Sequence, residues 1–272
     1  MSEGKKHLVI PDAHAKPGID NRRFDWLGQI IMDERPDTII CIGDFADMES
    51  LSSYDKGKRG FEGRRYHKDV EAAKDAMTRV MAPMNEYNAR QRDTKHHDRQ
   101  YKPRLVMCLG NHENRIDRAT NDQAEFDGLL SVDNLGYADM GWEVHPFLEE
   151  VEVDGVHYSH YFVSGVMAKA IGGENPATML LNKQHKSCTA GHSHLADWSQ
   201  RRQVGGQHIM GCVVGCFFEH HELYVPPSVS SMWWRGLVIK ENVVNGCYDP
   251  RFLSMNTIKH RYLKEGQPWS IK

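Results

Sequence analysis

Polar side chains fall in five short clusters along this 272-residue sequence. In chain order the clusters are Asp12-x-His14, Gly43-Asp44, Gly110-Asn111-His112-Glu113, a lone His160, and Gly191-His192-x-His194. Carboxylates, imidazoles and amide oxygens are ligands of divalent metal ions. Two such ions about 4 Å apart can clamp the attacking and the leaving oxygen of a phosphoryl group. The clusters together are therefore compatible with metal-assisted hydrolysis of a phosphate ester.

Buried strands are predicted to position the first three clusters. Apolar runs at residues 7–10, 38–42 and 105–109 each end at a cluster, and a helical pattern at 21–34 separates the first two runs. This order predicts a βαβαβ unit, in which the carboxyl ends of the strands present side chains at one edge of a sheet. Shorter strands are predicted in the second half, and the segment after Pro250 is expected to be an irregular or partly ordered surface segment.

The five clusters resemble, in type and order, the motifs of the calcineurin-like metallophosphoesterase family, from residue 12 to residue 194. The resemblance implies an α/β fold, a four-layer αββα sandwich of two mixed sheets flanked by helices. It also implies a metal-dependent hydrolase of phosphate esters with a dinuclear metal centre and a metal-bridging hydroxide. The two divalent ions would be manganese in the first instance, with iron, zinc or nickel also compatible, because the ligands include no thiolate.

Carried over residue by residue, the resemblance makes Asp44 the ligand that bridges both ions. The remaining ligands would be Asp12, His14 and His194 at the first ion, and Asn111, His160 and His192 at the second. His160 is preferred to His157 because it lies at the end of its strand. Residues at i and i+2 of a strand share a face, so alternation could aim both members of each Asp-x-His or His-x-His pair into one cleft.

Two further residues are candidates for catalysis. His112 resembles the family histidine that approaches the phosphate without binding metal, and it could protonate the leaving oxygen. Asp47 matches a carboxylate that orients this histidine in part of the family, although a solvated loop acid is the alternative. Met48 occupies the position of an arginine in the phosphoprotein phosphatases, which disfavours protein phosphatase activity.

The segment at about 55–104 is basic, with 14 Lys and Arg against 8 Asp and Glu, whereas the whole chain has a net charge of −3. We predict one domain over residues 1–272 with a basic helical insertion there, whose long helix covers about 67–88. The insertion is either a solvated helix with loops or a rim for phosphates and bases. The rim candidates are Arg59, Arg64, Arg65 and Arg90 with Tyr66 and Tyr87. Trp233 and Trp234 could likewise stack on a base, or belong to the core.

The function therefore leans to a phosphodiesterase or nuclease, with a nucleic acid or nucleotide as the partner. The alternatives are a phosphomonoesterase acting on small molecules or proteins, and a catalytically silent module that binds metal or nucleic acid. No apolar run reaches the roughly 20 residues of a membrane-spanning helix, and the N-terminus lacks the pattern of a signal peptide. We accordingly expect no membrane partner and a cytoplasmic location.

Overall fold

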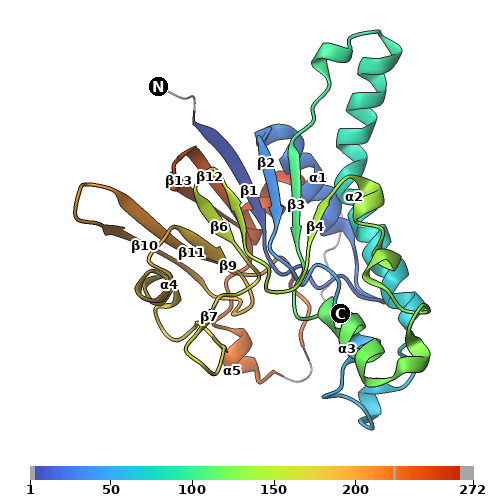
Figure 1. Ribbon diagram of the computed structural model, residues 1–272. Helices are drawn as coiled ribbons and strands as arrows, with labels where there is room; N and C mark the ends of the chain where they lie inside the picture. The colour runs from blue at the N-terminus through green and yellow to red at the C-terminus, as the bar shows by residue number, and fades with distance from the viewer. Residues whose placement is uncertain (1–3, 223–224, 264–272) are drawn as a thin grey trace.

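Two mixed β-sheets pack face to face in the computed structural model, which describes residues 4–222 and 225–263 (Figure 1). The larger sheet consists of β1 (Lys5–Ile10), β2 (Thr38–Cys41), β3 (Arg104–Cys108), β4 (Glu143–His145), β12 (Gly236–Val244) and β13 (Cys247–Ser254). The smaller sheet consists of β5 (Val151–Val153), β6 (Val156–Tyr158), β9 (Cys188–Ala190), β10 (Ala196–Arg202) and β11 (His208–Val214). Their strand orders are β13-β12-β1-β2-β3-β4 and β10-β11-β9-β6-β5. A separate short hairpin pairs β7 (Val163–Ser164) with β8 (Lys169–Ala170).

Helices cover the outer faces of the two sheets. The α-helices are α1 (Arg22–Glu34), α2 (Tyr66–Asp93), α3 (Asn114–Asp122), α4 (Pro176–Gln184), α5 (Pro227–Ser230) and α6 (Met255–Tyr262). Short 3₁₀ helices lie at Glu49–Leu51, Arg59–Phe61, His97–Arg99, Ala124–Phe126, Val132–Leu135 and Ala138–Met140. Helices α1 and α2 share a core with the larger sheet, and α4 packs on the smaller sheet. The four layers confirm the predicted αββα sandwich. In the described part of the chain, no helix has the length and apolar character needed to span a membrane.

The central strands are apolar on both faces because both faces are buried. In β1, Leu8 and Ile10 join the core beneath the helices, whereas Val9 points into the core between the two sheets. Strands β1, β2 and β3 run parallel, with Ile10 paired to Cys41 and Ile39 paired to Leu105. Their carboxyl ends therefore meet at one edge, as predicted, and the loops that follow begin side by side.

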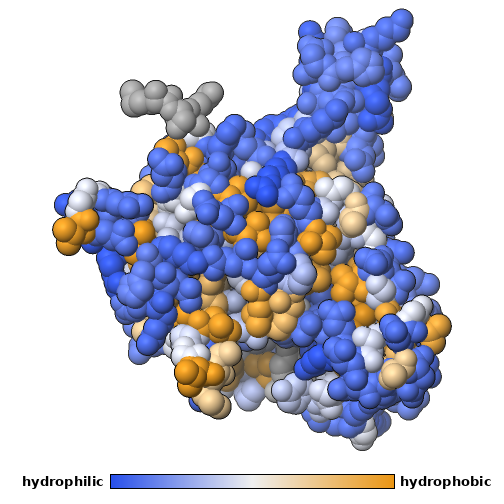
Figure 2. Space-filling model, viewed as in Figure 1, coloured by the Kyte–Doolittle hydropathy of each residue, from blue (hydrophilic) through white to orange (hydrophobic). Residues whose placement is uncertain are grey.

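Helix α2 runs away from this edge of the sheet (Figure 1). It has 28 residues and is therefore about 42 Å long. Its predicted apolar face is buried against α1 and includes Ala73, Met77 and Met84. Its far part projects beyond the sheets and is almost uniformly hydrophilic (Figure 2). The division into one domain with an insertion stays a prediction.

The expectation for the segment after Pro250 was wrong over residues 251–263, and residues 264–272 lie outside the described residues. This segment completes β13 and forms α6, whose Ile258 is buried. Proline lacks the amide hydrogen of a strand and is tolerated at a sheet edge. Strand β13 is such an edge strand, with Pro250 opposite Lys240 of β12. The proline therefore interrupted the sequence pattern without interrupting the strand.

Candidate metal centre

Each predicted ligand lies in a loop that follows a strand. Asp12 follows β1, Asp44 follows β2 and Asn111 follows β3, while His160 follows β6 and the remaining histidine pair follows β9. The expected strand alternation does not aim the pairs, because His14, His192 and His194 have φ angles of 45°, 66° and 58°. These residues lie in left-handed turns, so tight loop geometry rather than an extended strand brings their side chains together.

One group of candidate ligands contains Asp12, His14 and His194, all buried. Each offers a ligand atom, and these atoms lie within 4.8 Å of one another. Nε2 of His194 is 3.1 Å from Oδ2 of Asp12. The backbone amide of His192 donates to the same carboxylate oxygen at 3.0 Å, which fixes its orientation. The three side chains predicted at the first ion therefore converge.

A second group contains Asp44, His160 and His192, with the same spacing of ligand atoms. Nδ1 of His160 donates to the carbonyl of Ile42 at 3.0 Å, so Nε2 is the ring nitrogen directed toward the other ligands. This Nε2 lies 2.9 Å from Oδ1 of Asn111 and 3.3 Å from Oδ2 of Asp44. The structure thus brings together all four side chains predicted around the second ion.

Asp44 lies near a histidine of each group. Its Oδ2 is 3.3 Å from Nε2 of His160 and 3.8 Å from Nε2 of His14. Its Oδ1 accepts a hydrogen bond from the backbone amide of His112 at 2.8 Å. Burial alone would raise the pKa of Asp44, but His112 and His160 outweigh it and lower that pKa well below its usual range. The carboxyl group is therefore ionised.

The donor set fits bound cations. Both ring nitrogens of the buried His14 have no hydrogen-bond partner among the described residues. A buried polar atom left unsatisfied costs about 1–3 kcal/mol. Burial, followed by the charge of His112, lowers the pKa of His14, so this imidazole is neutral and has a lone pair to offer. Neutral imidazoles, carboxylates and an amide oxygen are suitable ligands for divalent transition metals.

His112 and Asp47 contact each other as predicted. Nδ1 of His112 donates to Oδ1 of Asp47 at 3.0 Å and to its carbonyl oxygen at 2.9 Å. Nε2 of His112 is therefore the nitrogen directed toward Asp44, at 3.8 Å from Oδ2. Burial disfavours the charged ring, but Asp44 and Asp47 outweigh it and raise the pKa of His112. Asp47 is buried, so the alternative of a solvated loop acid is wrong.

Two glycines allow backbone to approach the carboxylates. A Cβ at Gly110 would lie 2.1 Å from Oδ1 of Asp44, and one at Gly191 would lie 2.4 Å from Oδ1 of Asp12. Such distances are far inside van der Waals contact. Glycine is therefore required at both positions for the ligand carboxylates to reach their places.

Several polar residues of the site carried no assigned role in the sequence. Glu113 is fully buried and accepts backbone hydrogen bonds from the loops after β2 and β3. Lys16 lies 2.9 Å from Glu222, which in turn is 2.8 Å from Nε2 of His220. Arg115 contacts His112. Glu113 had a signal, its place in the third motif, and Arg115 lies two residues after that motif in the sequence. Tertiary structure alone brings Lys16 and Glu222 together.

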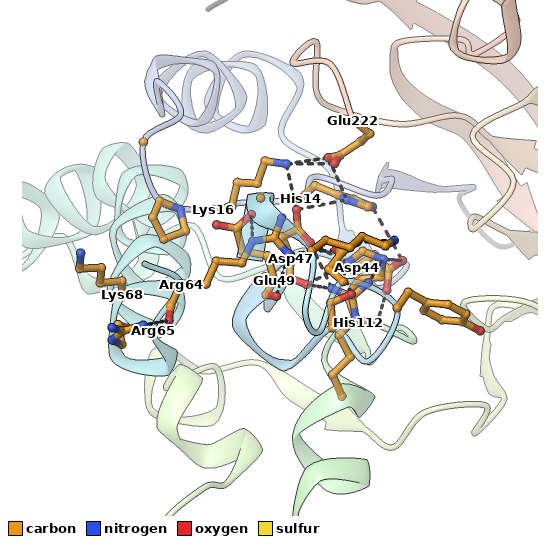
Figure 3. Close-up of a pocket in the computed structure, with 18 of the residues that line it drawn as sticks. His14, Lys16, Asp44, Asp47, Glu49, Arg64, Arg65, Lys68, His112 and Glu222 are labelled. Carbon is orange, nitrogen blue, oxygen red and sulfur yellow. Dashed lines mark hydrogen bonds and ion pairs between the residues drawn. The ribbon is translucent and has the colours of Figure 1, made fainter. Parts of the chain in front are cut away.

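A cavity of about 910 Å³ opens from these ligands. The first turn of α2 and the loop before it form one side, including Arg64, Arg65 and Lys68. Figure 3 shows Arg65 and Lys68 apart from Asp44 and His112. Arg65 and Lys68 are exposed, and Tyr54 on the same side is 80% exposed.

Of the six candidates for a rim, Arg64 and Arg65 line the cavity and the other four do not. Arg90 and Tyr87 lie in the far part of α2, away from the cavity, and the Tyr87 ring stacks with Arg35. The hydroxyl of Tyr66 is bonded to Asn134. Arg59 is exposed but does not line the cavity.

The two tryptophans pack within the protein rather than facing the cavity. Trp234 packs edge-on against Phe252 at a centroid distance of 5.5 Å. The Trp233 ring lies 4.5 Å from the ring of His194 and 5.6 Å from that of Phe218. Trp233 therefore supports a candidate ligand.

Comparisons with known proteins give limited information. No protein-family model matches the sequence, and no curated protein matches it. Among solved structures, the chain is similar to that of Yfce, a phosphoesterase from E. coli, with 11% identity and a TM-score of 0.38 over 92% of this chain and 100% of that one. A second structure shows 10% identity and a TM-score of 0.39, with the same coverage. Likenesses of this size assign no function to the chain.

Proposed function

We propose that this protein is a metal-dependent phosphoester hydrolase with two divalent ions, of the calcineurin-like metallophosphoesterase kind. One observation carries the proposal: the buried, ionised Asp44 places one carboxylate oxygen 3.3 Å from His160 of its own ligand group and 3.8 Å from His14 of the other group. The partnerless nitrogens of His14 support the same conclusion. Nitrogen and oxygen ligands without thiolate suit manganese, iron, zinc or nickel.

The roles of the protein's own groups follow from their contacts. When bound, the ions would polarise the phosphoryl group and lower the pKa of a coordinated water. Asp47 holds the proton on Nδ1 of His112, so the ring presents Nε2 to the substrate. A protonated Nε2 can donate to the leaving oxygen as the bond to phosphorus breaks. Asp44 and Asp47 both favour that protonated form.

The cavity supports a nucleic acid or a nucleotide as the substrate. Arg65 and Lys68 are exposed on its outer side and could contact phosphates beyond the reacting one. Tyr54 offers an exposed ring for stacking on a base. We therefore favour phosphodiester over phosphomonoester hydrolysis.

The test is a metal-reconstitution assay. The stripped protein is resupplied with Mn²⁺, Zn²⁺, Ni²⁺ or Mg²⁺ and assayed on bis-p-nitrophenyl phosphate, p-nitrophenyl phosphate and a labelled oligonucleotide. We expect metal-dependent turnover, faster on the diesters, that is abolished in Asp44→Asn and reduced at least 100-fold in His112→Ala. The exposed Asp127→Asn variant is the matched control and should behave as wild type.

Other outcomes are equally informative. Faster turnover of the monoester would replace the diesterase assignment with a phosphomonoesterase. Calorimetry showing that the stripped protein binds none of the four metals would refute the metal centre itself. Metal binding without turnover of any substrate would favour the silent binding module.

A further inference from the structure

The cations that line the cavity differ in how fully carboxylates neutralise them. The ammonium of Lys16 lies 2.9 Å from Glu222 and 3.3 Å from Asp47. The guanidinium of Arg64 is paired with Asp55 at 2.9 Å and with Glu49 at 3.5 Å. Both side chains are therefore held by two acids each, and neither has charge to spare for an anionic ligand.

Arg115, in the first turn of α3, has a different environment. Its Nη1 donates to the carbonyl oxygen of Asp47 at 2.8 Å, and its Nη2 lies 3.0 Å from Nε2 of His112. Its nearest carboxylate oxygen, Oδ1 of Asp47, is 3.4 Å away. That same oxygen accepts the hydrogen bond of His112, and its carboxylate is also paired with Lys16. The positive charge of Arg115 is thus only partly compensated.

The place of this guanidinium is close to the chemistry. Its side chain is 12% exposed and lines the cavity. It touches Nε2 of His112, the nitrogen that lies 3.8 Å from Asp44. Arg65 and Lys68, by contrast, lie on the outer side of the cavity (Figure 3). Some of the cations in the described cavity lining lie beside the ligand groups. Among those, Arg115 is the one whose charge is not neutralised by two carboxylates.

We propose that Arg115 binds the phosphoryl group of the substrate directly. This inference rests on the proposed function and names a substrate-binding residue of the same site. A planar guanidinium can form two parallel hydrogen bonds to phosphate oxygens. Without substrate, Nη2 lies 3.0 Å from Nε2 of His112. When a phosphate accepts hydrogen bonds from this guanidinium instead, Nε2 of His112 is released, takes up a proton from solvent and can donate it to the leaving oxygen.

The test measures binding of inorganic phosphate to the metal-loaded protein by calorimetry. Arg115→Met and Arg115→Lys are compared with Arg118→Met, an exposed arginine in the same helix. A charge-assisted hydrogen bond contributes about 10- to 100-fold in affinity. We therefore expect Arg115→Met to weaken phosphate binding by at least 10-fold, Arg115→Lys to weaken it less, and Arg118→Met to leave it unchanged.

Metal binding is the second measurement. Metal affinity should be unchanged in all three variants, and KM for bis-p-nitrophenyl phosphate should rise in Arg115→Met. Phosphate binding within twofold of wild type in both Arg115 variants would overturn the inference, as would a parallel loss of metal. If the wild-type protein binds metal and phosphate but hydrolyses nothing, the proposed function fails, while the phosphate affinities still decide the role of Arg115.

Discussion

The carboxylate of Glu113 accepts a hydrogen bond from the backbone amide of Asp44 at 3.0 Å, although the two residues are 69 positions apart in the chain. The same carboxylate accepts from the amides of Gly110 at 2.9 Å and Ala46 at 2.8 Å. It thereby fastens the loop after β2 to the loop after β3. Burial and the charge of Asp44 raise the pKa of Glu113 to about 7, against the effect of these donors.

Replacing Glu113 with Gln should loosen the metal centre. The new amide group would face backbone donors, and an unsatisfied buried donor costs about 1–3 kcal/mol. Loss of a group that orients metal ligands typically lowers metal affinity 10- to 100-fold. Urea unfolding of the metal-free protein should show the first effect, and calorimetric titration with Mn²⁺ the second. The exposed Glu125→Gln variant is the control. Wild-type metal affinity in Glu113→Gln would show that the loops hold their places without this carboxylate.

Asp47→Asn should shift the pH profile of hydrolysis. Asp47 is one of the two carboxylates that raise the pKa of His112, so its neutralisation lowers that pKa. If protonated His112 is the acid, the alkaline limb of kcat/KM should move to lower pH and kcat should fall about 10- to 100-fold. Asp55→Asn removes another carboxylate of the cavity lining, one paired with Arg64 rather than with His112. An alkaline limb at the same pH in Asp47→Asn and in wild type would count against this role for His112.

The sequence was informative where local patterns determine structure. An apolar run that ends in a polar cluster placed Asp12, Asp44 and Asn111 correctly, because parallel neighbouring strands end at one edge. The sequence could not show how His14 reaches the site, since a left-handed turn at that residue depends on the loops that pack around it. The ligand set was therefore predictable, whereas the backbone geometry that aims it was not.

Long-range contacts account for the features of the site that the sequence did not predict. Glu222 reaches Lys16 from the segment after β11, and nothing local to either residue indicates this pairing. The rim candidates were drawn from the whole basic segment, because a count of charged residues does not show where each side chain lies. Helix α2 separates Arg65 from Arg90 by 25 residues, about 37 Å along a helix axis.

The two ends of the basic helix α2 are predicted to differ in how strongly their side chains bind an oligonucleotide. In a His112→Ala background, which slows turnover at least 100-fold, the double variant Arg65→Gln/Lys68→Gln should bind a single-stranded oligonucleotide more weakly. The slope of log affinity against log salt should fall by about 1.4 for the two lost contacts. Arg90→Gln/Arg92→Gln removes the same charge from the far end of α2 and should leave the slope unchanged. A larger effect of the second pair would move the binding surface to that end of the helix.

We expect the buried His7 to make the folded protein less stable at acidic pH. Its ring is fully buried, with Nδ1 2.7 Å from the hydroxyl of Tyr158 and Nε2 2.9 Å from Oδ2 of Asp154. Burial lowers the pKa of His7 from 6.5 to about 4, more than Asp154 raises it. The unfolded chain therefore binds a proton between these pH values that the folded chain does not, and stability falls as the pH falls from 6.5 to 4.

Over that window the contribution of His7 reaches about 3 kcal/mol. Because His7→Gln cannot take up the proton, its free energy of unfolding should decline less between the same two pH values than that of the wild type. Urea unfolding at a series of pH values measures the difference, with the exposed His67→Gln as the control. The comparison isolates His7, since other buried histidines titrate in both proteins and cancel. Parallel pH curves for His7→Gln and wild type would mean that Asp154 compensates the charged ring and that His7 is protonated in the fold.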